Sequence, residues 1–593
     1  MEPRTLNEIF FRIVDRRQEQ LMLARGATSW LPISSQDFYR NVAGVARALT
    51  SWGISKGDRV AILSENRPEW ATTDFACFLL GAAVVPIYST LTAEQSAYIV
   101  ADSGAKVIFV STAGQLKKVL STQGQTGVER IVVMDAIGGS EAICMKQLMN
   151  KGPSGRDPEL ERVARSITPD DLASIIYTSG TTGRSKGVQL THGNLTSNVS
   201  HSLTGFDVGP GHISLSFLPL SHVTARHVDI ALLYNGVTLA YCPFFEDLPQ
   251  ALREVRPTIF VGVPRVYEKI YLQVERSVQG KAKQAIYRWA HTVGNAHRPT
   301  ILTGNIPKSL KWKLAHQIVY SKVRAHLGGR VQMFISGGAP LGKELAEWYA
   351  NLGIRIHEGY GLTETSPVIA VNNPQAHKLG TVGRPLRNIE VRIADDSEIL
   401  VRGPSVFRSY WNRVEETRDA FVDGWFKTGD IGMLDDDGFL SVTDRKKDLL
   451  KTSGGKFIAP QPVENSLKLH AFIGAAVVVG DRRKFAAVLI SPHFPLLEEW
   501  AQANNIAFST REALVKHPKV KALYEDIVAE VNRGLARFET LKKVLLVPDE
   551  FTATDGSLTP TLKLRRKVIE ERYRKQIDML YEEASDYERS AAC

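Results

Sequence analysis

Cysteine is scarce in this chain of 593 residues, and long hydrophobic runs are absent from it. Its four cysteines, Cys77, Cys144, Cys242 and Cys593, lie too far apart in the sequence for a CxxC metal or redox pair. Four cysteines in so long a chain do not suggest a disulfide scaffold either. The longest apolar stretch, residues 75–88, is shorter than the ~20 residues of a membrane-spanning helix. We therefore expect a cytoplasmic protein and leave open a peripheral contact with a membrane surface.

The N-terminus lacks the uninterrupted apolar segment of a signal peptide, because charged residues occur throughout residues 1–20. Leu6, Ile9, Phe10 and Ile13 instead recur at helical spacing, which predicts an amphipathic helix docked on the surface. No fixed-period repeat or low-complexity tract is present.

Composition places the chain among ordinary globular proteins, since 44% of its residues are hydrophobic and 23% are charged. Its formal net charge of +10 favours anionic partners in general. The basic residues look spread along the sequence, with their main local run at residues 563–567. Zinc-finger spacing and aromatic RNA-binding signatures are missing, so nucleic acid is not an expected partner.

Helical and strand patterns alternate in the first part of the chain, which predicts βαβ units on a parallel sheet. A chain of 593 residues exceeds the length at which one hydrophobic core keeps growing, so at least two packed units are expected. The predicted helices are residues 37–49, 70–80 and 93–101, and the predicted strands are residues 59–63, 83–88, 105–110, 173–177, 213–217, 238–242, 258–261 and 331–335. The fold class is therefore α/β, with helices on both faces of large sheets.

The pattern changes at about residue 381 to short strands separated by glycine and aspartate. This change predicts a β-rich subdomain over residues 381–445. A charged segment follows, and then a mixed pattern that includes strand-like residues 475–479 and 486–489. We predict an N-terminal domain of residues 1–445 and a small α+β C-terminal domain of residues 446–593.

The strongest local signal is a loop rich in glycine, serine and threonine that follows an apolar strand and leads to Lys186. Backbone N–H groups, hydroxyls and a lysine together can bind phosphate oxygens. The loop is not a Walker A motif, because Ser185 and not glycine precedes Lys186. The candidate phosphate-binding residues besides Lys186 are Thr178, Ser179, Gly180, Thr181, Thr182 and Gly183.

Here the chain resembles the AMP-forming acyl-CoA synthetases, a superfamily that also contains luciferases and peptide-synthetase adenylation domains. The resemblance begins at residues 177–187 and continues, motif after motif in the family's order, over nearly the whole chain. It implies that a glycine loop borders the adenine of ATP. The residues of that loop are Gly337, Gly338, Ala339 and Pro340.

Residues 358–365 resemble the family's aromatic, threonine and glutamate motif. The resemblance places Tyr360 and Gly361 at the nucleotide, with Tyr360 stacked on adenine. It assigns Thr363 to the α-phosphate and Glu364 to Mg²⁺. One protein carboxylate suits a metal whose other ligands are phosphate oxygens.

Residues 423–430 and 444–448 match the family's ribose and hinge motifs. Asp430 would accept hydrogen bonds from both ribose hydroxyls. Arg445 would assist at the ribose or phosphate, and Lys447 aligns with the hinge about which a mobile C-terminal domain rotates between two half-reactions.

Two C-terminal motifs complete the resemblance. Gly454, Gly455 and Lys456 belong to a loop that resembles the one closing on coenzyme A. Lys563 matches the catalytic lysine of the long-chain branch.

The implied reaction is the activation of a carboxylic acid by ATP as an acyl-adenylate, followed by transfer of the acyl group to the thiol of coenzyme A. Residues 218–226 and 256–269 read like those of long-chain fatty-acid ligases. His222 would lie near the acyl and phosphate groups, although a buried structural histidine is an equal alternative. Long-chain relatives often have a glutamate before the arginine that corresponds to Arg226, where this chain has Ala225. This difference leaves open both the chain length of the acid and the residue that contacts Arg226.

Three alternatives remain at this point: an aryl-acid ligase or other acid–thiol ligase of the same superfamily, a nucleotide-binding homologue without catalysis, and a phosphotransferase. The expected small molecules are a fatty acid, ATP, Mg²⁺ and coenzyme A. Formation of a homodimer is left open.

Overall fold

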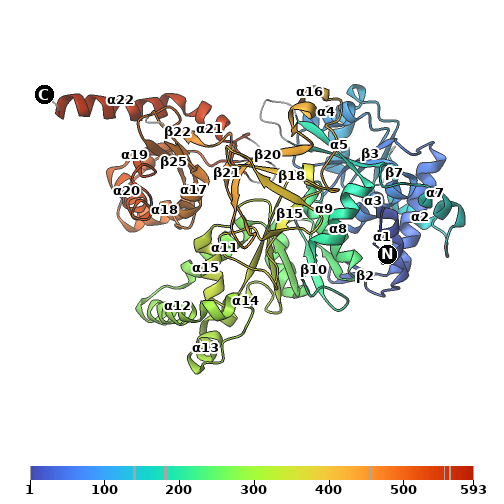
Figure 1. The fold of residues 1–593 in the computed structure, drawn as a ribbon, viewed down its shortest axis with the longest axis horizontal. Coiled ribbons are helices and arrows are strands. Elements are labelled where there is room, and N and C mark those ends of the chain that lie inside the picture. The colour runs from blue at the N-terminus through green and yellow to red at the C-terminus, as the bar shows by residue number, and fades with distance from the viewer. Residues whose placement is uncertain are drawn as a thin grey trace.

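The computed structural model describes residues 2–137, 142–178, 185–453, 456–552, 555–559 and 563–591, with side chains described up to residue 582. Figure 1 shows two large sheets with their helices, a smaller β-rich part at their junction, and a C-terminal unit that ends in the long helix α22 (Arg574–Ala591). No helix in the described ranges is both long and apolar enough to cross a membrane.

The first large sheet has seven strands in the order β7-β6-β5-β3-β4-β8-β9. All its neighbours pair in parallel except β8 and β9, which are antiparallel. The strands are β3 (Arg59–Leu63), β4 (Ala83–Ile87), β5 (Val107–Val110), β6 (Arg130–Val133), β7 (Ile143–Cys144), β8 (Leu172–Thr178) and β9 (Lys186–Thr191).

The second large sheet has nine strands in the order β16-β15-β14-β13-β12-β10-β11-β1-β2. Its centre is parallel, while β2 and the β15–β16 end are antiparallel. The strands are β1 (Met22–Arg25), β2 (Trp30–Ile33), β10 (Ile213–Ser216), β11 (Thr238–Tyr241), β12 (Ile259–Gly262), β13 (Met333–Ser336), β14 (Ile356–Gly361), β15 (Val368–Val371) and β16 (Arg384–Pro385).

Helices cover both faces of the seven-stranded sheet. Side chains alternate between its faces along each strand, so apolar residues of one strand contribute to a core on each face. Val60 and Ile62 of β3 belong to the main core, whereas Ala61 and Leu63 belong to a separate core on the opposite face. The main core also receives Ile259 of β12, so it lies between the two large sheets. The predicted α/β class with helices on both faces is confirmed, and the predicted strand ends in the two large sheets differ from the observed ends by at most two residues.

The helices of the large N-terminal part pack around these two sheets. They are α1 (Leu6–Asp15), α2 (Ser35–Ser51), α3 (Pro68–Leu80), α4 (Ala93–Ser103), α5 (Ala113–Ser121), α6 (Met145–Asn150), α7 (Pro158–Arg165), α8 (His192–Ser202), α9 (Val223–Tyr234), α10 (Leu248–Val255), α11 (Pro264–Ser277), α12 (Lys281–Leu302), α13 (Leu310–Ala315), α14 (Ser321–Ala325), α15 (Lys343–Asn351) and α16 (Val414–Asp419).

An antiparallel sheet in the order β17-β18-β20-β19, with β21 paired to β20, lies within the region predicted to be β-rich. Its strands are β17 (Glu390–Ile393), β18 (Glu398–Arg402), β19 (Phe421–Val422), β20 (Trp425–Leu434) and β21 (Leu440–Arg445).

The C-terminal unit has its own sheet, in the order β24-β25-β26, and its own apolar clusters. The hairpin β22 (Leu450–Lys451) and β23 (Phe457–Ile458) precedes β24 (Ile473–Val479), β25 (Ala486–Pro492) and β26 (Leu541–Leu546). The remaining helices are α17 (Pro460–Lys468), α18 (Phe494–Ala503), α19 (Arg511–Lys516), α20 (Pro518–Asn532) and α21 (Arg566–Arg572).

A buried ion pair joins helices α3 and α9 in the main core. The Arg226 guanidinium of α9 donates to both carboxylate oxygens of Asp74 on α3, at 2.6 and 2.8 Å. It also donates to the Ser174 hydroxyl of β8 at 2.7 Å, and both charged side chains are only 4% exposed. Asp74 is therefore the carboxylate that pairs with Arg226, a partner that the sequence did not identify.

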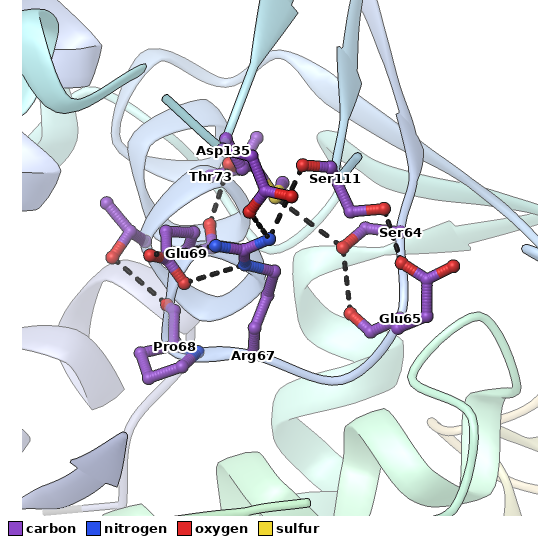
Figure 2. A network of polar contacts seen from close by, with 10 residues as sticks. Ser64, Glu65, Arg67, Pro68, Glu69, Thr73, Ser111 and Asp135 are labelled. Carbon is purple, nitrogen blue, oxygen red and sulfur yellow. Dashed lines mark hydrogen bonds and ion pairs between the residues drawn. The ribbon is translucent and has the colours of Figure 1, made fainter. Parts of the chain in front are cut away.

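The loop after β3 connects the carboxyl ends of strands in both large sheets. Figure 2 shows its polar network, in which Glu65 accepts from Ser111, and Arg67 donates to Glu69 at 3.0 Å and to Asp135 at 2.9 Å. This network fixes the loop from which Asn66 reaches the other sheet.

Asn66 bonds to the segment that follows β10. Its side-chain amide donates to the Leu218 carbonyl at 2.7 Å and accepts from the Leu220 N–H at 3.2 Å. The segment that leads to His222 is therefore attached to the seven-stranded sheet.

Candidate active site

The hairpin of β8 and β9 brings the two ends of the predicted phosphate loop together. Thr178 pairs with Lys186 across the two strands, so both lie at the same end of the hairpin. The predicted residues Ser179, Gly180, Thr181, Thr182 and Gly183 lie outside the described residues.

A segment far along the chain packs against this hairpin. The Trp411 N–H donates to the Gly187 carbonyl at 2.7 Å, and Tyr410 forms an antiparallel bridge with Val188. A Cβ at residue 187 would lie 2.7 Å from the Ile175 side chain and 3.1 Å from that of Trp411, so glycine is required there.

Tyr410 connects Lys186 to Glu364. The Lys186 ammonium lies 5.3 Å from the centre of the Tyr410 ring, within the range of a cation–π contact. The Tyr410 hydroxyl donates to Glu364 Oε1 at 2.9 Å. A cation, an aromatic ring and a carboxylate from three segments therefore form one continuous group.

Glu364 and Thr363 lie in the short helical turn Thr363–Thr365, between strands β14 and β15. Removal of Glu364 from water raises the pKa of its carboxyl, while the Tyr410 hydroxyl and Arg445 act in the opposite direction. The turn is tight, because a Cβ at Gly361 would lie 1.8 Å from the Pro367 carbonyl oxygen.

The predicted adenine loop follows β13 and lies beside the end of β14. The Gly337 N–H donates to the Gly262 carbonyl at 3.2 Å, and Gly338 has a φ of +82°. Ala339 and Pro340 are exposed at the tip of this loop.

A buried carboxyl, Glu358, lies next to that loop. Its Oε2 accepts from the Leu341 N–H at 3.3 Å, and Ser336 pairs with Glu358 across β13 and β14. Burial raises the pKa of Glu358 to about 7, with the Leu341 N–H opposing the shift. Glu358 stands in a motif that the sequence identified, but no role was predicted for it.

Tyr360, Asp430 and Arg445 form a second connected group. The Tyr360 hydroxyl donates to Asp430 Oδ2 at 2.6 Å, and Arg445 Nε lies 3.0 Å from Asp430 Oδ1. Asp430 and Arg445 are cross-strand partners on β20 and β21, and Asp430 is 4% exposed. Glu364 is close enough to interact electrostatically with both Asp430 and Arg445, so the two groups share one site.

His222 is the residue that immediately precedes α9, and it caps that helix. Its Nδ1 accepts from the Thr224 N–H at 3.1 Å, so the ring proton is on Nε2. Burial, with a smaller effect of the nearby Lys563 charge, lowers the pKa of His222 to about 3. His222 is therefore a neutral N–H donor that lies within electrostatic reach of Lys563.

Lys563 comes from the C-terminal unit. Its backbone N–H donates to Thr559 Oγ1 at 3.0 Å and its carbonyl accepts from the Thr559 N–H at 2.8 Å, which makes a tight loop. Surrounding protein lowers the pKa of Lys563 to about 8, Arg445 lowers it further, and Asp430 acts in the opposite direction. Lys563 is therefore within electrostatic reach of Asp430, Arg445 and His222.

Among the remaining predicted residues that the structure describes, Lys456 has no contact with this cluster. Lys456 is exposed in the β22–β23 hairpin, where its backbone bonds to Thr452. Gly454 and Gly455 lie outside the described residues. Lys447 is near Arg445, and burial followed by repulsion from Arg445 lowers its pKa.

The assembled group combines three cations, Lys186, Arg445 and Lys563, with two carboxylates, Glu364 and Asp430. Three cations suit a ligand with several negative charges, such as a nucleoside triphosphate. Within the described ranges, no three His, Cys, Asp or Glu side chains are arranged to hold a metal ion. Glu364 fits a metal whose remaining ligands come from the phosphates.

Sequence reasoning missed Tyr410 and Asp74. Tyr410 lies in residues 405–413, where no motif was assigned, and only its pairing with β9 reveals its contacts with Lys186 and Glu364. Asp74 directly precedes the apolar residues 75–80 of its helix, and a carboxylate beside such a run is itself a signal for a buried partner.

Comparison with known protein families gives two matches. A model described as AMP-binding enzyme matches residues 11–411, and a model described as AMP-binding enzyme C-terminal domain matches residues 447–585.

Curated relatives match over most of their length. The long-chain-fatty-acid–CoA ligase FadD15 of Mycobacterium tuberculosis is 38% identical over 93% of this chain and 92% of the relative. The peroxisomal long chain acyl-CoA synthetase 7 of Arabidopsis thaliana is 31% identical over 98% of this chain and 86% of the relative.

Solved structures share the fold. The anthranilate CoA ligase AuaEII in complex with anthranoyl-AMP has a TM-score of 0.73 at 20% identity, over 96% of this chain and 97% of that one. The adenylation domain of a carboxylate reductase from Mycobacterium chelonae has a TM-score of 0.76 at 21% identity, over 97% of this chain and 91% of that one.

Proposed function

Since the chain belongs to the AMP-binding enzyme family, we propose that it is a fatty-acid–CoA ligase that activates a long-chain fatty acid with ATP and transfers the acyl group to coenzyme A. The observation that carries the proposal is the convergence of one charged group from distant segments, namely Lys186, Glu364, Asp430, Arg445 and Lys563.

The first half-reaction joins two anions. A fatty-acid carboxylate oxygen attacks the α-phosphorus of ATP, the new O–P bond forms, and the bond to pyrophosphate breaks. Because both reactants are negative, catalysis depends on neutralising charge and on alignment. Lys186 and Lys563 supply positive charge, and the neutral His222 offers an Nε2–H to a carboxylate or phosphate oxygen.

The nucleotide would lie between the two connected groups. Asp430, held by Tyr360 and Arg445, can accept the ribose hydroxyls, and the Tyr360 ring can stack on adenine. Thr363 lies one residue before Glu364 and can donate its hydroxyl to the α-phosphate. Mg²⁺ would be held by Glu364 together with phosphate oxygens and would neutralise charge on the leaving pyrophosphate.

The second half-reaction transfers the acyl group to a thiol, and AMP leaves. Lys563 is not needed for this step, and water must be excluded. We propose that residues 446–593 rotate about Lys447 and bring Gly454, Gly455 and Lys456 to coenzyme A. The exposed position of Lys456, away from the charged group, is consistent with such a second arrangement.

The fatty-acid preference rests on the curated relatives, which are named as long-chain-fatty-acid–CoA ligases and long-chain acyl-CoA synthetases. Coenzyme A products from purified protein, ATP and a panel of fatty and aromatic acids would be measured by mass spectrometry. A long-chain acyl-CoA together with AMP is the expected result. Products from aromatic acids alone would favour an aryl-acid ligase, and absence of pyrophosphate release with every acid would contradict catalysis.

A further inference from the structure

The net charge of the protein is concentrated in one helical projection, which corrects the impression that basic residues are spread along the sequence. Residues 281–330 contain ten lysines and arginines and no aspartate or glutamate, and the whole chain has a formal net charge of +10. The rest of the chain therefore contains equal numbers of basic and acidic residues. In Figure 1 this projection comprises α12, α13 and α14 and forms the lower end of the molecule.

Buried apolar side chains attach the projection to the rest of the protein. Trp312 and Tyr320 are buried at 4% and 0% exposure in the core on the α15 side of the nine-stranded sheet. The Tyr320 hydroxyl donates to the Ala290 carbonyl of α12 at 2.6 Å. A Cβ at Gly294 would lie 2.1 Å from the Asn351 carbonyl oxygen, so α12 packs closely against α15. The position of the tip is thus fixed by packing.

The outer face of the tip is apolar. Ile306 and Leu310 are 81% and 82% exposed, and Leu314 is 47% exposed. Leu310 and Leu314 are four residues apart on α13 and therefore share a face, opposite to the buried Trp312. Three large apolar side chains at one outer surface cost free energy in water, so they call for a partner.

The projection that carries these apolar side chains is basic, and Lys308, Lys311 and Lys313 stand next to them in the sequence. Eight basic residues of the projection are exposed: Lys281, Lys283, Arg288, Lys308, Lys311, Lys313, Lys322 and Arg330. In the part of the chain that the structure describes, none of the eight forms an ion pair. The other two are used inside the protein, where Arg298 pairs with Glu347 and Arg324 donates to the Gly353 carbonyl.

We propose that this projection docks on the surface of an anionic lipid bilayer, with Ile306, Leu310 and Leu314 inserted among the lipids and the surrounding lysines at the headgroups. Apolar side chains beside lysines match the boundary between acyl chains and anionic headgroups. This docking does not depend on the ligase reaction.

Two other occupants fit less well. A nucleic acid would use the cations but gain nothing from exposed leucines. Of the aromatic rings that could stack on bases, Trp312 and Tyr320 are buried and Tyr287 and Trp289 are half-buried. A second copy of the chain would bring two strongly basic faces together, which opposes association.

Sedimentation of purified full-length protein with sucrose-loaded vesicles tests the proposal. Vesicles of phosphatidylcholine alone are compared with vesicles containing about one third phosphatidylglycerol. The protein should pellet with the anionic vesicles and be released by salt, because salt screens the attraction. No preference for anionic vesicles would overturn the proposal.

Two groups of substitutions separate the contributions. Lys308→Gln with Lys311→Gln and Lys313→Gln should weaken binding roughly a hundredfold, given the usual contribution of a basic residue near an anionic surface. Leu310→Gln with Leu314→Gln should weaken it at least about tenfold. Matched controls far from the tip are Lys519→Gln with Lys521→Gln on α20, and Leu120→Gln on α5, whose side chain is 52% exposed.

Pyrophosphate release with a water-soluble short-chain acid reports whether each variant is folded, because none of these residues belongs to the charged cluster. If the leucine variant binds vesicles as wild type does, insertion is refuted. If the lysine variant alone loses binding and wild type binds duplex DNA equally well, the surface is a general polyanion site and the proposal fails.

Discussion

The two ends of the candidate active site are built in opposite ways. At one end, Asp430 is buried and Glu364 is half-buried, and hydroxyl donors hold their carboxylates at 2.6 and 2.9 Å. At the other end, the ammonium of Lys563 forms no hydrogen bond with any described residue, although it lies close enough to the site for burial to lower its pKa. In the proposed mechanism the first end is preorganised for a nucleotide, whereas the second is delivered by a loop of the C-terminal unit. Groups fixed before the reaction lose little free energy to reorganisation, while a delivered group can also be withdrawn.

The largest effect that tests this contrast is expected from Lys563→Ala. In the proposed mechanism Lys563 acts only during adenylation, so its loss should slow acyl-adenylate formation about a thousandfold. Transfer to coenzyme A from a supplied acyl-adenylate should stay near the wild-type rate. Each half-reaction is followed by single-turnover kinetics, with pyrophosphate as the first readout and acyl-CoA as the second.

Wild-type protein and Lys567→Ala, an exposed lysine on α21, serve as controls for that experiment. An equal loss in both half-reactions would mean that Lys563 remains in place throughout, and the contrast between a fixed and a delivered end would fail.

The buried Asp74–Arg226 pair of the main core, which lies outside the charged cluster, should instead act through stability. Asp74→Ala leaves the buried Arg226 guanidinium without its carboxylate, which typically costs 3–5 kcal/mol, so about 3 kcal/mol or more should be lost from the free energy of unfolding. Urea denaturation measures the loss. Both half-reactions should decline together as the protein unfolds.

A paired change gives the control. Asp74→Leu combined with Arg226→Met removes both charges and fills similar volume, so stability should recover to near the wild-type value. A double variant as unstable as Asp74→Ala would show that lost packing, and not the unpaired charge, dominates.

The fold and the fixed end were largely predictable because both depend on local patterns. Strand β3 alternates residues between two cores, and its predicted bounds, residues 59–63, match the structure. Asp430 and Arg445 each lie in a recognisable motif, but their ion pair depends on the register between β20 and β21.

Long-range pairing explains what could not be predicted. Tyr410 joins Lys186 to Glu364 only because a segment more than two hundred residues later adds to the edge of β9. A tyrosine outside any motif gives no sign of such a partner. The same limit applies to Asp74, whose side chain signals a buried cation without identifying Arg226.

Tyr410→Phe sharpens the contrast within the fixed end. The substitution keeps the ring beside Lys186 and removes the donor to Glu364. Without that hydrogen bond the pKa of Glu364 should rise further, because burial already favours the neutral carboxyl. A hydrogen bond to a charged group contributes ~1.5–3 kcal/mol, so the Mg²⁺ concentration for half-maximal activity should increase about tenfold or more.

The Mg²⁺ dependence of pyrophosphate release measures this effect. Tyr410→Leu, which also removes the ring, should show the same change and an additional loss of ATP affinity through Lys186. An unchanged Mg²⁺ dependence in Tyr410→Phe would contradict the proposal that Glu364 binds the metal.

The smallest effect concerns the pH dependence of the delivered end. The pKa of Lys563, lowered from 10.5 to about 8, leaves the amine mostly charged at pH 7 and mostly neutral at pH 9. Adenylation needs the charged form, so kcat/KM for ATP, which reports the free enzyme, should fall about tenfold between these two pH values. Transfer from supplied acyl-adenylate should not follow this decline, since Lys563 is not used there. Lys563→Arg is the control, because a guanidinium stays charged throughout the range and should abolish the decline while retaining part of the activity. If the arginine variant declines in the same way, another group titrates, and the charge delivered by the C-terminal unit is not what limits adenylation at high pH.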